Sequence, residues 1–181
     1  IDALKVRVYL RQGRLSEALA WAREHGLSVD DDLSYLDEFE HVTLARILIA
    51  QYKNDPLADS IHDAIALLER LLQAAEADRR MGSVIEILVV QALAHEAQGN
   101  IPLALTSIEC ALALAEPEGY VRIFVDEGEP MRLLIEKQSR NRDHPLIGYA
   151  DKLLTAFPQP AATSKSAIIH QKSDMIEPLR E

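Results

Sequence analysis

The chain has 181 residues, which suffices for one domain or a short repeat array with a sizeable core. Apolar residues make up 48% and aromatic residues only 5%, so the core must come from Leu, Ile, Val and Ala, a composition that favours helices over sheets. The formal net charge of −10 argues against direct nucleic-acid contact by this segment, because phosphate binding needs clustered Lys and Arg.

The lack of recognisable targeting signals and the low cysteine content indicate where in the cell the protein is expected. No apolar run approaches the ~20 residues needed to cross a bilayer, and no signal peptide opens the chain, so we expect no membrane contact and a cytoplasmic location. The single cysteine, Cys110, excludes an internal disulfide framework, and its apolar neighbours predict a small buried side chain. The chain opens on Ile1 in what already reads as helix, so we expect a fragment of a longer protein.

Glycine and proline residues separate a series of segments in which apolar residues recur every three or four positions. This pattern predicts helices joined by turns. The first four helices are expected at residues 3–12, 16–25, 37–52 and 60–77, with an acidic connector at 30–32. The fourth carries one apolar stripe whose members recur every three or four residues, namely Ile61, Ile65, Leu68 and Leu72.

The fifth and sixth helices have recognisable starts. Ser83-x-x-Glu86 after Gly82 predicts a capping box at the start of the fifth helix, which would occupy the Glu86 carboxylate. This helix is apolar almost all round through residue 90, which is typical of an inner helix packed on both sides. Asn100 is expected to cap the sixth helix, with Pro102 in its first turn.

Small residues mark where these two helices must cross closely and turn: Ala92, Gly99, Ala104, Ala111 and Pro117. This constellation is the skeleton of a tetratricopeptide-type helical hairpin, a repeat unit that binds and assembles. The turn position recurs at Gly13, Tyr52 and Gly99, which indicates about three hairpins. We therefore expect an all-α fold in which tetratricopeptide-like antiparallel hairpins form a fragment of a right-handed solenoid or superhelix.

Beyond the repeats the pattern changes. Residues 119–138 predict two short helices broken at 127–130, with Tyr120 and Phe124 as apolar anchors, and residues 145–157 predict a last helix. A polar stretch with two prolines follows. The expected organisation is a helical-repeat domain at 1–157 and a linker at 158–181.

Three stretches carry a resemblance to a known family. They are GYVRIFVDEGEPM at 119–131, LLERLLQAAEADRRMGSVIEILVVQALAHEAQGN at 67–100, and IEPLRE at 176–181. Together they resemble, over residues 40–181, the region before the DNA-binding domain of MalT-like, ATP-dependent LuxR-type transcriptional regulators. The last stretch resembles the run that leads into the helix-turn-helix domain.

The resemblance implies a helical-repeat sensor between an N-terminal nucleotide-binding switch and a C-terminal helix-turn-helix. Neither flanking part is present, since the sequence contains no GxxxxGK[ST] phosphate loop and stops before any recognition helix. ATP is therefore expected only in the absent N-terminal domain. We expect no cofactor in this segment.

Candidate contacts follow from the repeat register, because the first helix of each hairpin lines the concave face of such arrays. This register places seven residues there: Arg7, Val42, Arg46, Ile49, Val89, Leu93 and Glu96. Their mixture of apolar and charged groups suits a small polar ligand, such as an inducer, or a peptide. The same face could instead pack against missing repeats, neighbouring domains of the parent protein or another protomer. Glu86 is left out because of its expected capping role.

No catalytic or metal-binding constellation emerges. The six histidines include no i,i+4 pair and no Cys/His cluster with metal spacing, and residues 30–32 lack the remaining positions of a calcium loop. We therefore expect a non-enzymatic segment that senses an effector and supports self-association or protein interaction in a LuxR-type regulator. The alternative is a free-standing tetratricopeptide scaffold that grips a peptide or partner protein.

Overall fold

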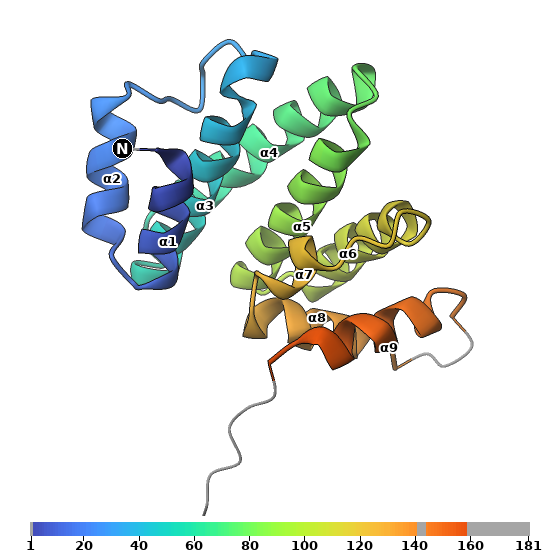
Figure 1. The fold of residues 1–181 in the computed structure, drawn as a ribbon. Coiled ribbons are helices and arrows are strands. Elements are labelled where there is room, and N and C mark those ends of the chain that lie inside the picture. Colours follow the sequence, from blue (N-terminus) through green and yellow to red (C-terminus); the bar gives the residue numbers. More distant parts are fainter. Residues whose placement is uncertain (1, 141–143, 159–181) are drawn as a thin grey trace, which may run out of the picture.

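Three helix pairs follow one another along the chain and precede a C-terminal unit of three helices (Figure 1). The computed structural model describes residues 2–140 and 144–158, and every regular element in these ranges is helical. The pairs are α1 (Ala3–Arg11) with α2 (Leu15–Glu24), α3 (Glu38–Asn54) with α4 (Ser60–Ala77), and α5 (Met81–Ala97) with α6 (Ile101–Ala115). A 3-10 turn, η1 (Tyr35–Asp37), leads into α3, and α7 (Arg122–Val125), α8 (Glu129–Gln138) and α9 (Ile147–Ala156) complete the fold.

Local signals explain where several of these helices begin and end. The Asp2 carboxylate accepts a hydrogen bond from the Leu4 amide and caps α1, and the Asn100 side chain accepts one from the Leu103 amide and caps α6 as expected. Gly99, between α5 and α6, has a φ of +81°, a conformation that glycine adopts without steric cost. The connections within the pairs, at 12–14, 55–59 and 98–100, are short, so the paired helices run antiparallel.

The core is centred on α5, which contacts α3, α4 and α6 as well as α7 and α8. Its side chains are buried over most of the helix circumference, as the all-round apolar sequence predicts: Val84, Ile85, Ile87, Leu88, Val89, Val90, Gln91, Ala92, Leu93 and Ala94. The facing ridge of α6 is fully buried and consists of Ala104, Ile108, Ala111 and Ala115. The predicted close crossing of α5 and α6 is therefore confirmed.

The C-terminal unit packs on this third hairpin. Phe124 and Met131 are fully buried, and the Phe124 ring meets the Tyr149 ring edge-on, with 6.3 Å between centroids. The Tyr149 hydroxyl donates a hydrogen bond to the Tyr120 carbonyl, which ties α9 to the segment before α7. Phe124 is thus an apolar anchor as predicted, whereas the Tyr120 side chain is exposed.

The structure corrects other local predictions. Cys110 is exposed on α6, because it lies on the face of the helix opposite the alanine ridge. α3 runs through Tyr52 to Asn54, so Tyr52 lies within a helix and does not form the turn. α5 begins two residues before Ser83, with Arg80 at the N-cap position and no side-chain cap, so the predicted capping box does not form. The linker predicted at 158–181 lies outside the described residues except for Pro158.

Candidate functional site

Four of the seven predicted contact residues meet around one pocket: Arg7, Arg46, Ile49 and Leu93. The pocket has a volume of about 240 Å³ and lies between α1, α3, α5 and the turn that joins α7 to α8. Its other lining residues are Leu10, Arg11, Ala50, Lys53, Val90, Asp126, Glu127 and Pro130. We call this the junction pocket, because three helix pairs and the C-terminal unit contribute to its neighbourhood.

The other three predicted residues lie elsewhere. Val89 is fully buried, so its predicted place on an open binding face is wrong. Val42 lines a second pocket of about 360 Å³ beside the start of α3, together with Glu86 and Phe39. Glu96 sits one turn beyond Leu93 and pairs with Lys53 at 3.4 Å, and it does not line the junction pocket. Val89, Leu93 and Glu96 share one stripe of α5, so they differ in their position along the helix: Val89 is covered by the core, Leu93 lines the pocket, and Glu96 lies near the end of the helix.

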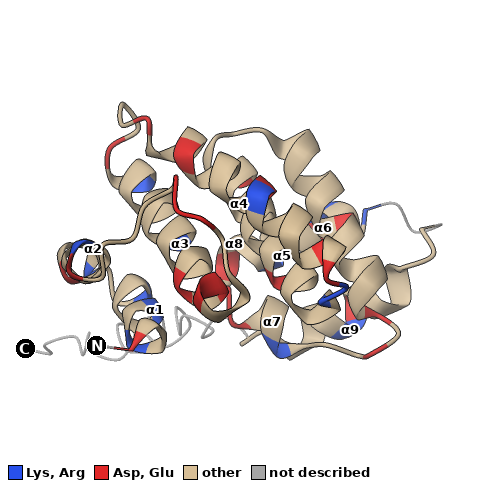
Figure 2. Cartoon of the chain, turned by 90° about the horizontal axis from the view of Figure 1, so that it is seen from above, with Lys and Arg blue, Asp and Glu red and all other residues tan. Residues whose placement is uncertain are grey.

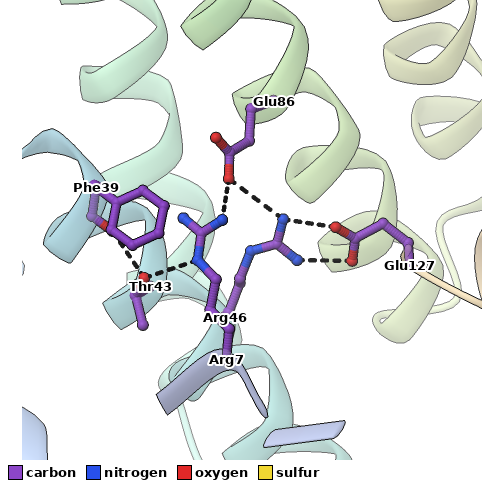
Figure 3. A network of polar contacts seen from close by, with 6 residues as sticks. All are labelled: Arg7, Phe39, Thr43, Arg46, Glu86 and Glu127. Carbon is purple, nitrogen blue, oxygen red and sulfur yellow. Dashed lines mark hydrogen bonds and ion pairs between the residues drawn. The ribbon is translucent and has the colours of Figure 1, made fainter. Parts of the chain in front are cut away.

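Arg7 on α1 crosses to both neighbouring helices. Its Nη1 donates to Glu86 Oε1 on α5 at 2.5 Å, and its Nε donates to Thr43 Oγ1 on α3 at 3.0 Å (Figure 3). The Thr43 hydroxyl in turn donates to the Phe39 carbonyl at 2.8 Å, while the Arg7 guanidinium stacks 3.8 Å from the centre of the Phe39 ring. Arg7 is therefore held in place by three residues from two helices, α3 and α5.

Arg46 on α3 completes the network from the other side. Its two terminal nitrogens donate to the two carboxylate oxygens of Glu127 at 2.7 Å each, a bidentate pair across 81 residues of sequence. Arg46 Nη2 also lies 3.6 Å from Glu86 Oε1, so Glu86 is shared between the two arginines. We call Arg7, Thr43, Arg46, Glu86 and Glu127 the charged junction. Viewed from above, α3 lies between α1 and α5 (Figure 2), and its Arg46 reaches Glu86 on α5 and Glu127 in the turn after α7.

Burial sets the electrostatics of the charged junction. The side chains of Arg46 and Glu127 are only 15% and 12% exposed, so this pair has lost most of its contact with water. Burial lowers the pKa of Arg7, and the nearby charge of Arg46 adds to that effect while Glu86 opposes it. Burial also acts to lower the pKa of Arg46, but Glu127 and Glu86 outweigh it and the pKa is raised. Both guanidinium groups stay charged near neutral pH, because arginine titrates far above it.

The donors of the two arginines exceed the acceptors around them. Among the described residues, Arg7 Nη2 and Arg46 Nε are buried without a hydrogen-bond partner. A buried donor without an acceptor costs about 1–3 kcal/mol, and more when it carries charge. The charged junction therefore carries an uncompensated hydrogen-bonding cost in this arrangement.

Three residues of the charged junction were missed by reasoning from the sequence: Thr43 and both carboxylates. Glu86 was assigned to a capping box, but the earlier start of α5 places it beyond the first turn, where it faces α1 and α3. Glu127 lies in the turn after α7, where Gly128 adopts a φ of +74° and lets the chain reverse into α8. Glu127 belongs to the stretch 119–131 that carried the family resemblance. This motif therefore supplies both an acidic side chain at the site and the break between two helices.

Residues 2–140 and 144–158 contain no group of three or more His, Cys, Asp or Glu side chains arranged to hold a metal ion. Within those same ranges, no helix is both long enough and apolar enough to cross a membrane.

A family model described as MalT-like TPR region matches residues 1–141 of the chain. The match includes the first forty residues, which the sequence resemblance had left out, and it contains every residue of the charged junction. Searches of curated proteins and of solved structures found no match.

Proposed function

Because the chain belongs to the family of MalT-like TPR regions, we propose that it is the effector-sensing and protein-interaction segment of a LuxR-type, ATP-dependent transcription regulator. The observation that carries the proposal is the junction pocket, where predicted contact residues from α1, α3 and α5 converge beside the C-terminal unit. Repeat arrays bind partners through surfaces that several repeats build together. A sensor role needs such a shared site.

The pocket's position supports a mechanism for passing on the signal. Asp126, Glu127 and Pro130 line it from the turn before α8, so a bound effector would touch both the repeats and the C-terminal unit. An effector shifts an equilibrium only if it binds one packing of these parts better than the other. We propose that this shift permits self-association of the regulator and DNA binding by its helix-turn-helix domain.

The proposal also specifies the surroundings of the segment. The three hairpins would form part of a right-handed superhelix that continues into neighbouring parts of a cytoplasmic parent protein. ATP would bind in the N-terminal switch domain, while this segment would hold no cofactor and catalyse no reaction. The net charge of −10 favours effector or protein partners over nucleic acid.

The parent gene tests the proposal directly. We expect a helix-turn-helix domain to be encoded within about 70 codons downstream, the length of one small domain. A nucleotide-binding domain with a phosphate loop is expected upstream. A parent gene that lacks the helix-turn-helix would overturn the proposed function.

The second pocket favours an alternative, a free-standing scaffold for a peptide or partner protein. Tyr35, Leu36 and Phe39 line that pocket and are exposed, and exposed clusters of large apolar side chains often mark protein-binding surfaces. A parent gene that encodes only further repeats, together with a defined partner that loses affinity on Leu36→Ser substitution, would establish this alternative. Retention of affinity in that variant would exclude this surface.

A further inference from the structure

We propose that the junction pocket binds a small organic anion, a carboxylate that carries a short aliphatic or aromatic part. This inference rests on the proposed sensor function and names the chemical class of its effector. Three features of the pocket carry it, namely the charge of its lining, its apolar wall and its size.

The lining is cationic in a strongly acidic chain. It contains Arg7, Arg11, Arg46 and Lys53 against Asp126 and Glu127, four positive side chains and two negative ones, whereas the whole chain has a formal net charge of −10. Focused charge of one sign in a concave surface attracts ligands of the opposite sign. An anion is therefore the ligand that this pocket favours electrostatically.

Both lining carboxylates already have cationic partners. Glu127 is held by two hydrogen bonds from Arg46, and Asp126 pairs with Arg122 at 2.7 Å. Arg11, by contrast, forms no ion pair with any residue in the described ranges, and Lys53 has only the 3.4 Å contact with Glu96. Arg11 and Lys53 are both exposed, so they can meet an incoming acidic group without breaking the charged junction.

The deeper arginines add a further reason. Arg7 and Arg46 lie close enough to repel each other, and each has a donor nitrogen without a partner in the described part of the chain. An anion in the pocket would reduce this repulsion. Neutral ligands could offer acceptors but would leave the repulsion unchanged.

The remaining wall defines the rest of the ligand. Its apolar members are Leu10, Ile49, Ala50, Val90, Leu93 and Pro130. The volume of about 240 Å³ is close to the lower end of the range of small-molecule sites, about 300–1,000 Å³, which suits a small metabolite. A carboxylate with a compact apolar portion fills both parts of the site.

A titration with phenylacetate tests the inference, using 1H–15N correlation spectra of the 181-residue chain at pH 7. We expect saturable shifts confined to amides of α1, α3, α5 and the turn before α8. Phenylacetamide has the same shape without the charge, and acetate has the charge without the apolar part. Each is expected to bind at least about tenfold more weakly, a difference of ~1.4 kcal/mol. Equal binding of the amide, of acetate or of inorganic phosphate would overturn the proposal, as would shifts that map elsewhere.

Matched variants separate a specific site from general charge attraction. Arg11→Gln and Lys53→Gln remove exposed lining cations and should each weaken phenylacetate binding about threefold or more. Lys152→Gln removes one exposed cation on α9, outside the pocket, and should leave the affinity unchanged. Equal losses in all three variants would show nonspecific attraction and overturn the proposal. The spectra themselves report whether each variant is folded.

Failure of this inference is distinguishable from failure of the proposed function. A neutral compound that binds the junction pocket more tightly than phenylacetate would overturn the anion assignment and leave the sensor role standing. A parent gene without a helix-turn-helix domain would overturn the regulator role and leave the measured anion site intact.

Discussion

Helix α5 takes part in two interfaces built from opposite chemistry. Toward α6 it meets an alanine ridge that includes Ala104 and Ala111, where small apolar residues let the helices approach closely. Toward α1 and α3 it presents Glu86 to two arginines. The first interface joins helices that are neighbours in sequence, whereas the second joins Glu86 to Arg7, 79 positions away.

The difference suggests a division of labour. A close-packed apolar interface loses stability with almost any change of volume, so it favours one arrangement. In the charged junction, some donor groups lack a full set of hydrogen-bond partners. Exchanging one partner for a ligand there should therefore cost less free energy. We therefore expect the α5–α6 interface to act as a rigid scaffold and the charged junction to be the adjustable part.

The largest expected effect comes from breaking the bidentate pair in the charged junction. Glu127→Ala leaves Arg46 buried without its main partner and should lower the free energy of unfolding by about 3 kcal/mol, at the low end of the range for buried pairs. Urea denaturation measures this change in the free energy of unfolding. Glu129→Ala, two residues away, removes a carboxylate that is 62% exposed and should cost less than about 1 kcal/mol. Equal losses of unfolding free energy in both variants would show that the buried pair stabilises the fold no more than the exposed one.

A double substitution sharpens the same point. Arg46→Leu combined with Glu127→Leu removes both charges and should recover most of the stability lost in Glu127→Ala, because no unpaired buried charge remains. The double variant should nevertheless bind phenylacetate more weakly than the unaltered chain. Recovery of stability with full retention of binding would contradict the role of Arg46 in the junction pocket.

Overpacking the alanine ridge should have a somewhat smaller effect. Ala111→Leu or Ala104→Leu inserts a larger side chain into the fully buried α5–α6 crossing and should cost about 1–3 kcal/mol of unfolding free energy. Ala113→Leu makes the same change on the exposed face of α6 and should be nearly neutral. Unchanged unfolding midpoints in both ridge variants would contradict the close crossing.

His95, a partly buried residue near the end of α5, predicts that stability depends on pH. Burial lowers the pKa of His95, although Glu69 opposes the shift, so folding favours the neutral ring. This contribution to stability is present above the unfolded pKa of about 6.5 and is lost as the pH falls below it, because the unfolded chain then binds the proton more readily. His95→Gln should flatten the decline in stability between pH 7 and pH 5.5. His62→Gln, at an exposed position, should leave the decline in place. The reverse pattern would contradict this assignment.

The smallest effect is expected at the edge of the junction pocket. Glu96→Leu removes a half-exposed pairing with Lys53 and should change the free energy of unfolding by less than about 0.5 kcal/mol. Phenylacetate should bind as well or better, since a competing carboxylate near Lys53 is gone. A loss above about 1 kcal/mol would show that this surface pair supports the fold.

Local patterns in the chain were enough to predict the helices and the best hairpin. The cap at Asn100, the apolar circumference of α5 and the small residues from Ala92 to Ala111 are properties of short segments, and periodicity reports them directly. The family resemblance at 119–131 likewise needed only contiguous residues. The start of α5 was misplaced, because Ser83-x-x-Glu86 has the form of a capping box whether or not the helix begins there.

The tertiary structure decided which charges meet. Arg7, Arg46, Ile49 and Leu93, which the repeat register placed on one face, line one pocket because the first helices of successive pairs lie side by side. The register placed Val89 wrongly because α5 is packed by α3, α4, α6, α7 and α8, which cover that position completely. Glu127 joins Arg46 only because α7 and α8 fold back onto α5, which brings together groups 81 residues apart. Pairing at that separation depends on the packing of whole helices, and no local pattern encodes it.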